Sequence, residues 1–153
     1  MIDPKLPSRT FSALPNGGHR RQLSGERRDI MGKKTKIKWR TEPQKQDHAG
    51  AEFYLTLHFE PEAAKKIVQT LQSAKISEFA AKDIFRASEL PLLPDRDSHV
   101  ENDRAKIIMG EEMTPILLVM SKSNGKVIIA DGYHRLCAVY MFDEDAQIPC
   151  QIV

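Results

Sequence analysis

The spacing of hydrophobic positions predicts which segments of the chain are strands and which are helices. Residues 53–59 alternate between apolar and polar side chains and are rich in aromatic and branched residues, which predicts a strand. The segment 61–74 begins with a proline and then repeats apolar residues at helical spacing, which predicts an amphipathic helix. The folded part is therefore expected to begin near Glu52.

The middle of the chain has a less regular pattern. Residues 77–90 fit either one helix or a strand followed by a short helix. Their expected core residues are Phe79, Ile84 and Phe85. A loop with two prolines follows. Residues 98–110 then predict a helix, with Ser98 as a candidate N-cap and Gly110 as a candidate C-cap.

The last third of the chain carries the clearest signals. It contains, in order, an apolar strand at 114–120, a hairpin turn at 123–126, a strand at 126–130, a helix at 132–142 and a final strand at 148–153. Strands and helices in this order predict an α+β domain in which helices flank a small mixed sheet.

Charge divides the chain into two parts. Residues 1–50 carry 12 Lys and Arg against 5 Asp and Glu, whereas residues 51–153 carry 11 against 16. Because the first part is rich in Pro, Gly and Ser and has no hydrophobic period, we expect a disordered basic tail at 1–50 before a folded domain at 51–153. The basic tail has two interpretations: it only keeps the protein in solution, or it makes weak contact with a nucleic-acid backbone. The excess of acidic residues in the domain argues against a domain that binds nucleic acid over its whole face. Met31 resembles a start of its own, so we hypothesise that residues 1–30 are an upstream extension.

The composition, 41% hydrophobic and 29% charged, is ordinary for a soluble protein. No apolar run approaches the roughly 18 residues of a membrane-spanning helix, and the N-terminus lacks the apolar block of a secretory signal. Two cysteines are too few for a disulfide framework, and the histidines lack the spacing of zinc ligands. We therefore expect a cytoplasmic protein with no membrane span and no metal site of its own.

Candidate chemistry is concentrated in Asp131-Gly132-Tyr133-His134-Arg135, where a predicted strand passes into a predicted helix. Gly132 permits an unusual backbone angle or the close approach of a ligand. A helix start offers free N–H groups to an anion, and the planar guanidinium of Arg135 suits phosphate. Asp131 could cap the helix, hold a magnesium ion or orient His134. The segment predicts a phosphate-binding corner, although the same residues also fit a simple cap and turn.

With the elements around them, these residues resemble the ParB/sulfiredoxin-like superfamily. The similar parts are the strand Thr114–Val119, the turn with Gly125, the strand Val127–Ile129, the motif at 131–135 and the closing strand Ile148–Val153. Residues 85–95 are similar to the first strand and loop of the family. The resemblance covers roughly residues 79–153 and implies a compact ParB/sulfiredoxin-like fold, with 52–74 as an addition to its core.

The resemblance implies that a nucleoside di- or triphosphate binds at the motif together with Mg²⁺. The implied phosphate-binding residues are Gly132, Tyr133, His134 and Arg135, and the implied catalytic residues are His134 and Asp131. Sulfiredoxins carry a cysteine before His-Arg, and because Tyr133 stands there, sulfiredoxin activity is not expected. ParB proteins read DNA through a region downstream, which this sequence lacks, so a chromosome-segregation clamp is not expected.

Three functions stay open. The first is a nucleotide-binding module in a DNA-linked system. The second is a small nucleotide-dependent phosphotransferase or hydrolase, because the motif resembles the Asp-Gly-His-His-Arg of free-serine kinases with one change. Such an enzyme needs a carboxylate as base, and the candidates are Glu89, Asp95, Asp97 and Glu101. The third is a non-catalytic DNA- or protein-interaction domain whose motif is only a helix cap.

Overall fold

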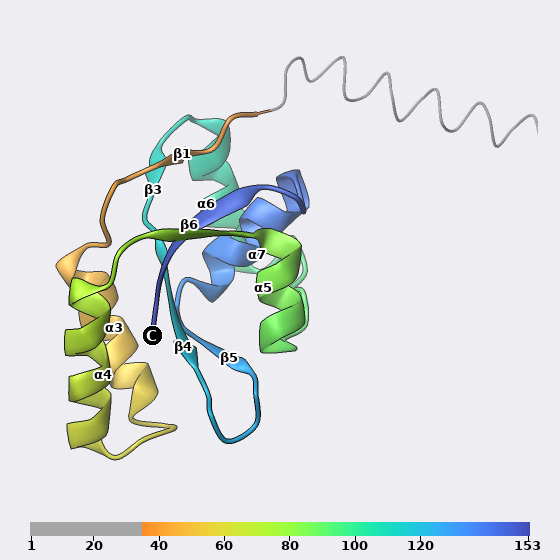
Figure 1. The fold of residues 1–153 in the computed structure, drawn as a ribbon. Helices are drawn as coiled ribbons and strands as arrows, with labels where there is room; N and C mark the ends of the chain where they lie inside the picture. The colour runs from red at the N-terminus through yellow and green to blue at the C-terminus, as the bar shows by residue number, and fades with distance from the viewer. Residues whose placement is uncertain (1–34) are drawn as a thin grey trace, which may run out of the picture. The chain divides into compact units, whose positions relative to one another are not determined.

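A four-stranded mixed sheet carries the fold of residues 35–153, the part of the chain that this computed structural model describes (Figure 1). Its order is β2-β6-β4-β5, and its bounds are β2 Ser77–Ala80, β4 Ile116–Met120, β5 Val127–Asp131 and β6 Gln147–Ile152. Strand β6 is antiparallel to β2 and parallel to β4, whereas β4 and β5 form an antiparallel hairpin. The short strands β1 Lys38–Trp39 and β3 Glu112–Met113 pair in parallel as a second sheet.

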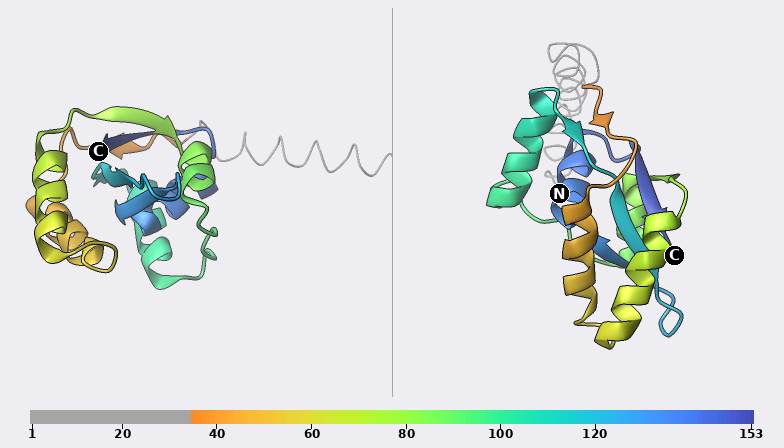
Figure 2. Two further views of the ribbon diagram at one scale, coloured as in Figure 1. Left: turned by 60° about the horizontal axis from the view of Figure 1, so that its bottom comes forward. Right: turned by 90° about the vertical axis from the view of Figure 1, so that its left-hand side faces the viewer.

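Helices cover both faces of the larger sheet (Figure 2). Within the described residues they are α3 Lys45–Leu55, α4 Pro61–Ser73, α5 Ala81–Ser88, α6 Ser98–Ile108 and α7 Tyr133–Phe142. Helices α3 and α4 pack on one face, and α5, α6 and α7 pack on the other. The expected α+β class with a small mixed sheet and flanking helices is therefore confirmed. No helix of the described part is long and apolar enough to cross a membrane.

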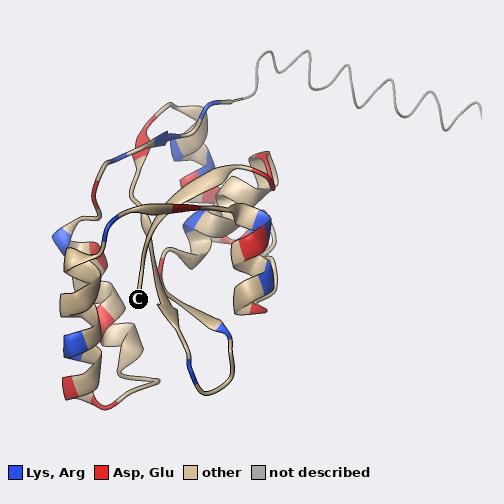
Figure 3. Cartoon of the chain, in the orientation of Figure 1, with Lys and Arg blue, Asp and Glu red and all other residues tan. Residues whose placement is uncertain are grey.

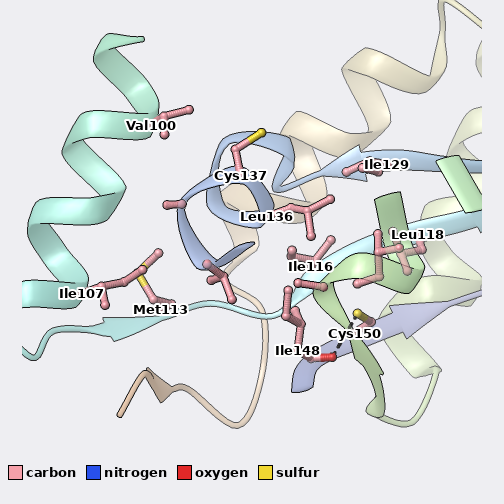
Figure 4. Packing of buried hydrophobic residues seen from close by; sticks show 14 residues of the cluster. Val100, Ile107, Met113, Ile116, Leu118, Ile129, Leu136, Cys137, Ile148 and Cys150 are labelled. Carbon is pink, nitrogen blue, oxygen red and sulfur yellow. Dashed lines mark hydrogen bonds between the residues drawn. The ribbon is translucent and has the colours of Figure 1, made fainter. Parts of the chain in front are cut away.

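Strand β4 separates two hydrophobic clusters because its side chains alternate across the sheet. Ile116 and Leu118 point into the larger cluster with α6 and α7, which Figure 4 shows from close by. Leu117 and Val119 point into the smaller cluster with α3 and α4. Because helices cover both faces of the strand, its sequence is a continuous apolar run rather than an alternation of apolar and polar residues.

Most predicted elements of the last third are present with small changes in their ends. The turn at 123–126 lies in the β4–β5 hairpin, with Gly125 at φ 71°. Residues 77–90 follow the second alternative, a strand and then a short helix. In that segment Ile84 is buried, as expected, and Phe85 is half-buried against the core, but Phe79 is exposed.

The strand predicted at 53–59 is wrong. The segment lies at the end of α3 and in the turns after it. Of its alternating apolar residues, Leu55 is fully buried, whereas Phe53 and Leu57 are 80% and 78% exposed. The buried positions of α3 instead recur at helical spacing, and Ala51 and Leu55 pack in the smaller cluster. The alternation was therefore accidental, because burial against the sheet follows the helical period.

The folded unit also begins earlier than expected. It runs from Lys36 to Val153, so residues 36–50, which we assigned to the tail, hold β1 and the first half of α3. Residues 1–34 of the expected tail lie outside the described residues. The hypothesis about residues 1–30 therefore lies outside them too. Figure 3 shows Lys and Arg interspersed with Asp and Glu along α4, α5 and α6.

Candidate functional site

The site is built around the corner where β5 passes into α7. Asp131 is the last residue of β5, and Gly132 is the N-cap of α7. Gly132 has φ 106° and ψ 17°, a left-handed conformation that favours glycine. A Cβ atom at this position would lie 2.8 Å from Ile116 Cγ1 and 3.0 Å from Arg135 Nη2. The corner therefore needs glycine both for its backbone angle and for the close packing of β4.

The N-terminus of α7 has no side-chain cap among the described residues. Leu136 N donates to Gly132 O at 2.9 Å, which closes the first turn of the helix. The amide groups of Tyr133, His134 and Arg135 precede that bond, so the geometry of a helix gives them no acceptor within it. Free N–H groups and the positive end of a helix dipole generally favour a negative group at a helix start.

Asp131 does not cap the helix, which was one of its three expected roles, because its carboxylate pairs with Arg135. Arg135 Nη2 donates to Asp131 Oδ2 at 2.9 Å and to Pro115 O at 3.3 Å. The side chains are 16% exposed for Arg135 and 25% for Asp131, so water screens the pair only partly. The buried Nε atom of Arg135 has no hydrogen-bond partner among residues 35–153. The pair ties the end of β5 to the first turn of α7.

A second carboxylate, Asp47 of α3, touches Asp131 from the other side. Burial raises the pKa of Asp131, the guanidinium of Arg135 opposes the rise, and the Asp47 side chain adds to it by charge and hydrogen bonding. Asp47 is buried, and its Oδ2 accepts the backbone N–H of Gln44 at 2.7 Å. The sequence did not identify Asp47, because it lies in the segment assigned to the tail.

Tyr133 and His134 make different contacts with the loop before α6. The Tyr133 hydroxyl donates to Pro91 O at 2.5 Å, and burial raises the pKa of that hydroxyl. His134 Nε2 lies 4.0 Å from Asp97 Oδ1, and its ring centroid lies 4.8 Å from that of His99. Tyr133 therefore fastens α7 to the loop, whereas His134 remains near half-exposed at the site.

A polar cleft of about 210 Å³ opens between this corner and α6. From the corner it is lined by Asp131, Gly132, His134 and Arg135, and from α6 by His99, Asn102, Asp103 and Lys106. The structure thus brings three of the four predicted phosphate-binding residues to one cleft. Tyr133 is not among its lining residues. The α6 residues were missed, although their spacing by three and four positions places them on one helical face and could have identified them.

The four candidate base carboxylates are distributed unequally around the site. Asp97 Oδ1 lies 4.0 Å from His134 Nε2. Glu89 pairs with Lys126 at 3.8 Å, and Asp95 pairs with Arg104 at 3.8 Å. Asp97 Oδ1 accepts the N–H groups of two residues at the start of α6, and the pKa of its carboxyl is lowered by these hydrogen bonds. Asp97 is therefore an ionised neighbour of His134 at neutral pH.

Neither cysteine lies among the residues that line the cleft. Cys137 and Cys150 are both buried free thiols, and burial raises the pKa of Cys150 to about 12. Within residues 35–153, no group of three or more His, Cys, Asp or Glu side chains is arranged to hold a metal ion. The chemistry of the cleft is therefore that of imidazole, ammonium, guanidinium, carboxylate and backbone amide groups.

Comparison with known proteins gave no relative for this chain. No family model matches it, and no curated protein or solved structure matches it either.

Proposed function

We propose that the chain is a ParB/sulfiredoxin-like domain that binds a phosphate-bearing ligand, a nucleoside di- or triphosphate, at the β5–α7 corner. The observation that carries the proposal is the uncapped start of α7, which opens on a polar cleft beside His134 and Arg135. Free N–H groups at a helix start bind phosphate oxygens well, because the dipole and the donors point the same way. The order of strands, motif and helix in the resemblance supports the same ligand.

The proposed contacts divide between backbone and side chains. The first amides of α7 hold the phosphate, and Gly132 admits it. His134 donates a further hydrogen bond from the wall of the cleft. Arg135 has five donor hydrogens, and its Nη2 contacts with Asp131 and Pro115 O leave Nη1 for the ligand. Bound Mg²⁺ would neutralise phosphate charge beside the carboxylate of Asp131.

Calorimetry of the full chain with ATP, ADP, CTP and GTP, each with and without Mg²⁺, tests the proposal. We expect Arg135→Ala to lose about 1.5–3 kcal/mol of binding free energy, as for one charge-assisted hydrogen bond. His134→Ala should lose about 0.5–1.5 kcal/mol, as for a neutral one. Arg86→Ala is the matched control, because Arg86 lies exposed on α5 and pairs with Asp83 of the same helix. Unchanged affinity in both site variants would refute the assignment.

Arg135→Ala leaves Asp131 without its cation, so stability is measured alongside affinity. Each titration is made below the thermal midpoint of the variant, and the ligand-induced rise of that midpoint supplies a second readout of binding. His134→Ala leaves both members of the Asp131–Arg135 pair in place, so it tests the site even where Arg135→Ala is poorly folded.

A second candidate function, a phosphotransferase or hydrolase, is favoured by the neighbouring Asp97 and His134. The imidazole of His134 is a candidate group for proton transfer, and the ionised carboxylate of Asp97 lies 4.0 Å away, beyond direct hydrogen-bond distance. Release of inorganic phosphate from bound nucleotide, lost in His134→Ala, would support an enzyme. Binding without turnover, with or without an added hydroxyl compound, would leave a binding module.

A further inference from the structure

We infer that the cleft recognises the phosphate chain of its ligand and leaves the nucleoside outside, so that binding is nearly indifferent to the base. The inference rests on the proposed function and names the chemical class that the site selects, a di- or triphosphate group. It follows from three features of the cleft: its size, its lining and its two separate groups of cationic donors.

The size of the cleft limits what can be enclosed. Pockets that bury most of a drug-sized molecule have volumes of about 300–1,000 Å³. The cleft between the corner and α6 has about 210 Å³. A chain of phosphate groups fits in that space, whereas a base, a ribose and a phosphate chain together do not. The nucleoside must then extend into solvent.

The lining offers no Phe, Tyr or Trp ring on which a base could stack. Single bases are commonly bound by stacking on exposed aromatic faces. Apart from Gly132, every residue that lines the cleft has a charged, amide or imidazole side chain. The two imidazole rings, His99 and His134, lie against each other with their centroids 4.8 Å apart. Tyr133, the aromatic residue of the motif, is tied by its hydroxyl to Pro91 O and does not line the cleft.

Two elements supply cationic donors to the cleft, which suits more than one phosphate. One group is the start of α7 with Arg135. The other is Lys106 of α6, whose Nζ lies 3.5 Å from Asp103 Oδ1. The Asp103 side chain is mostly buried, with 14% of its surface exposed. Its carboxylate offsets the positive charge of Lys106 when no ligand is bound. A phosphate at α7 leaves Lys106 free to bind the next phosphate along the chain.

Calorimetry with inorganic phosphate, pyrophosphate, tripolyphosphate and four nucleoside triphosphates in Mg²⁺ buffer tests the inference on the full chain. We expect the affinities of ATP, GTP, CTP and UTP to differ by less than about threefold, which is less than one good hydrogen bond to a base contributes. Tripolyphosphate should compete with all four nucleotides. A nucleotide that binds more than about tenfold tighter than the others, or a tripolyphosphate that fails to compete, would overturn the inference.

Variants of residues on α6 provide a second test of the inference. Lys106→Ala should weaken tripolyphosphate about tenfold and leave inorganic phosphate nearly unchanged, because a single phosphate stays at α7. Asp103→Asn should strengthen tripolyphosphate, since Lys106 loses its competing carboxylate and the side chain keeps its shape. A purely structural role for Asp103 does not predict this gain. Lys66→Ala, on the exposed side of α4 beyond the other face of the sheet, is the matched control.

The two levels of failure are distinct. If no phosphate compound binds the chain, the proposed function itself is wrong. If nucleotides bind and are weakened by His134→Ala but one base is strongly preferred, the site stands and the indifference to the base is wrong. If Lys106→Ala and Lys66→Ala have equal effects, α6 is not part of the phosphate site.

Discussion

Two helices begin at the same cleft, and their N-termini are built in opposite ways. Helix α6 begins after Asp97, whose Oδ1 accepts the N–H groups of His99 at 3.0 Å and Val100 at 3.1 Å. Helix α7 begins after Gly132, which has no side chain, so its N-cap residue makes no side-chain cap hydrogen bond. The two starts are neighbours, since His134 of α7 lies 4.0 Å from the cap of α6.

The difference separates a helix start that stabilises the fold from one that is available to a ligand. The carboxylate of Asp97 satisfies two donors and complements the dipole of α6, so that helix is complete without a ligand. At α7 the nearby carboxylate of Asp131 is held by Arg135 instead. A phosphate at α7 would supply from outside what Asp97 supplies to α6 from within.

Gly132→Ala should break the uncapped start. The left-handed angle costs a non-glycine residue about 1–2 kcal/mol, and the new methyl group would overlap Ile116 of the buried strand β4, which adds about 1–3 kcal/mol. We therefore expect urea unfolding to report a loss of roughly 2–5 kcal/mol.

Gly125→Ala is the control for the backbone angle alone. Gly125 in the β4–β5 hairpin has φ 71°, and a Cβ atom there would meet no atom of the described residues within 4 Å. Its expected loss is about 1–2 kcal/mol. Equal losses at the two glycines would mean that the contact with Ile116 relaxes freely and that the corner is not tightly packed.

The sequence predicted the corner well because its signals are local. The apolar run of β4, the turn at Gly125, and the Asp-Gly step before α7 each depend on residues close to one another in the chain. Such local chemistry predicts a strand, a turn and a helix start directly. The predicted residues Asp131, Gly132 and His134 accordingly lie together at the cleft.

The sequence could not predict what the tertiary fold adds to that corner. Asp47 reaches Asp131 from a helix 84 positions earlier, and that helix carries a hydrophobic pattern that mimics a strand. The cap of α6 was assigned one residue late, to Ser98, because Asp and Ser are nearly equal as N-caps. Lys106 is an ordinary basic residue on a polar face until α6 packs beside the corner.

Changing the cap of α6 tests the other half of the comparison. Asp97→Ala should cost about 1 kcal/mol of unfolding free energy, because two N–H groups lose their acceptor. Asp97→Asn should cost only a few tenths, because an amide oxygen caps nearly as well. Thermal and urea unfolding of both variants measure the difference. If Asn is as harmful as Ala, the charge of Asp97 is required, and its pairing with His134 matters more for stability than the cap does.

The smallest expected effect on stability concerns the two neighbouring carboxylates, Asp131 and Asp47. The raised pKa of Asp131 means that the folded chain binds a proton there more readily than the unfolded chain does. This contribution to stability is therefore full below the ordinary aspartate range, about 4, and is lost as the pH rises through the raised pKa. Asp47→Asn removes the neighbouring negative charge, and its amide oxygen can still accept the N–H of Gln44.

Asp47→Asn should therefore stabilise the chain modestly at pH 7 and change it little at pH 4. Urea unfolding at both values measures the effect, and Glu78→Gln on the exposed surface of β2 controls for the loss of one negative charge. A variant that is less stable than the natural chain at pH 7 would mean that Asp47 acts mainly as a hydrogen-bond partner of α3. The Asp131–Arg135 pair would then be set by burial and by the guanidinium alone, and α3 would support the corner only through packing.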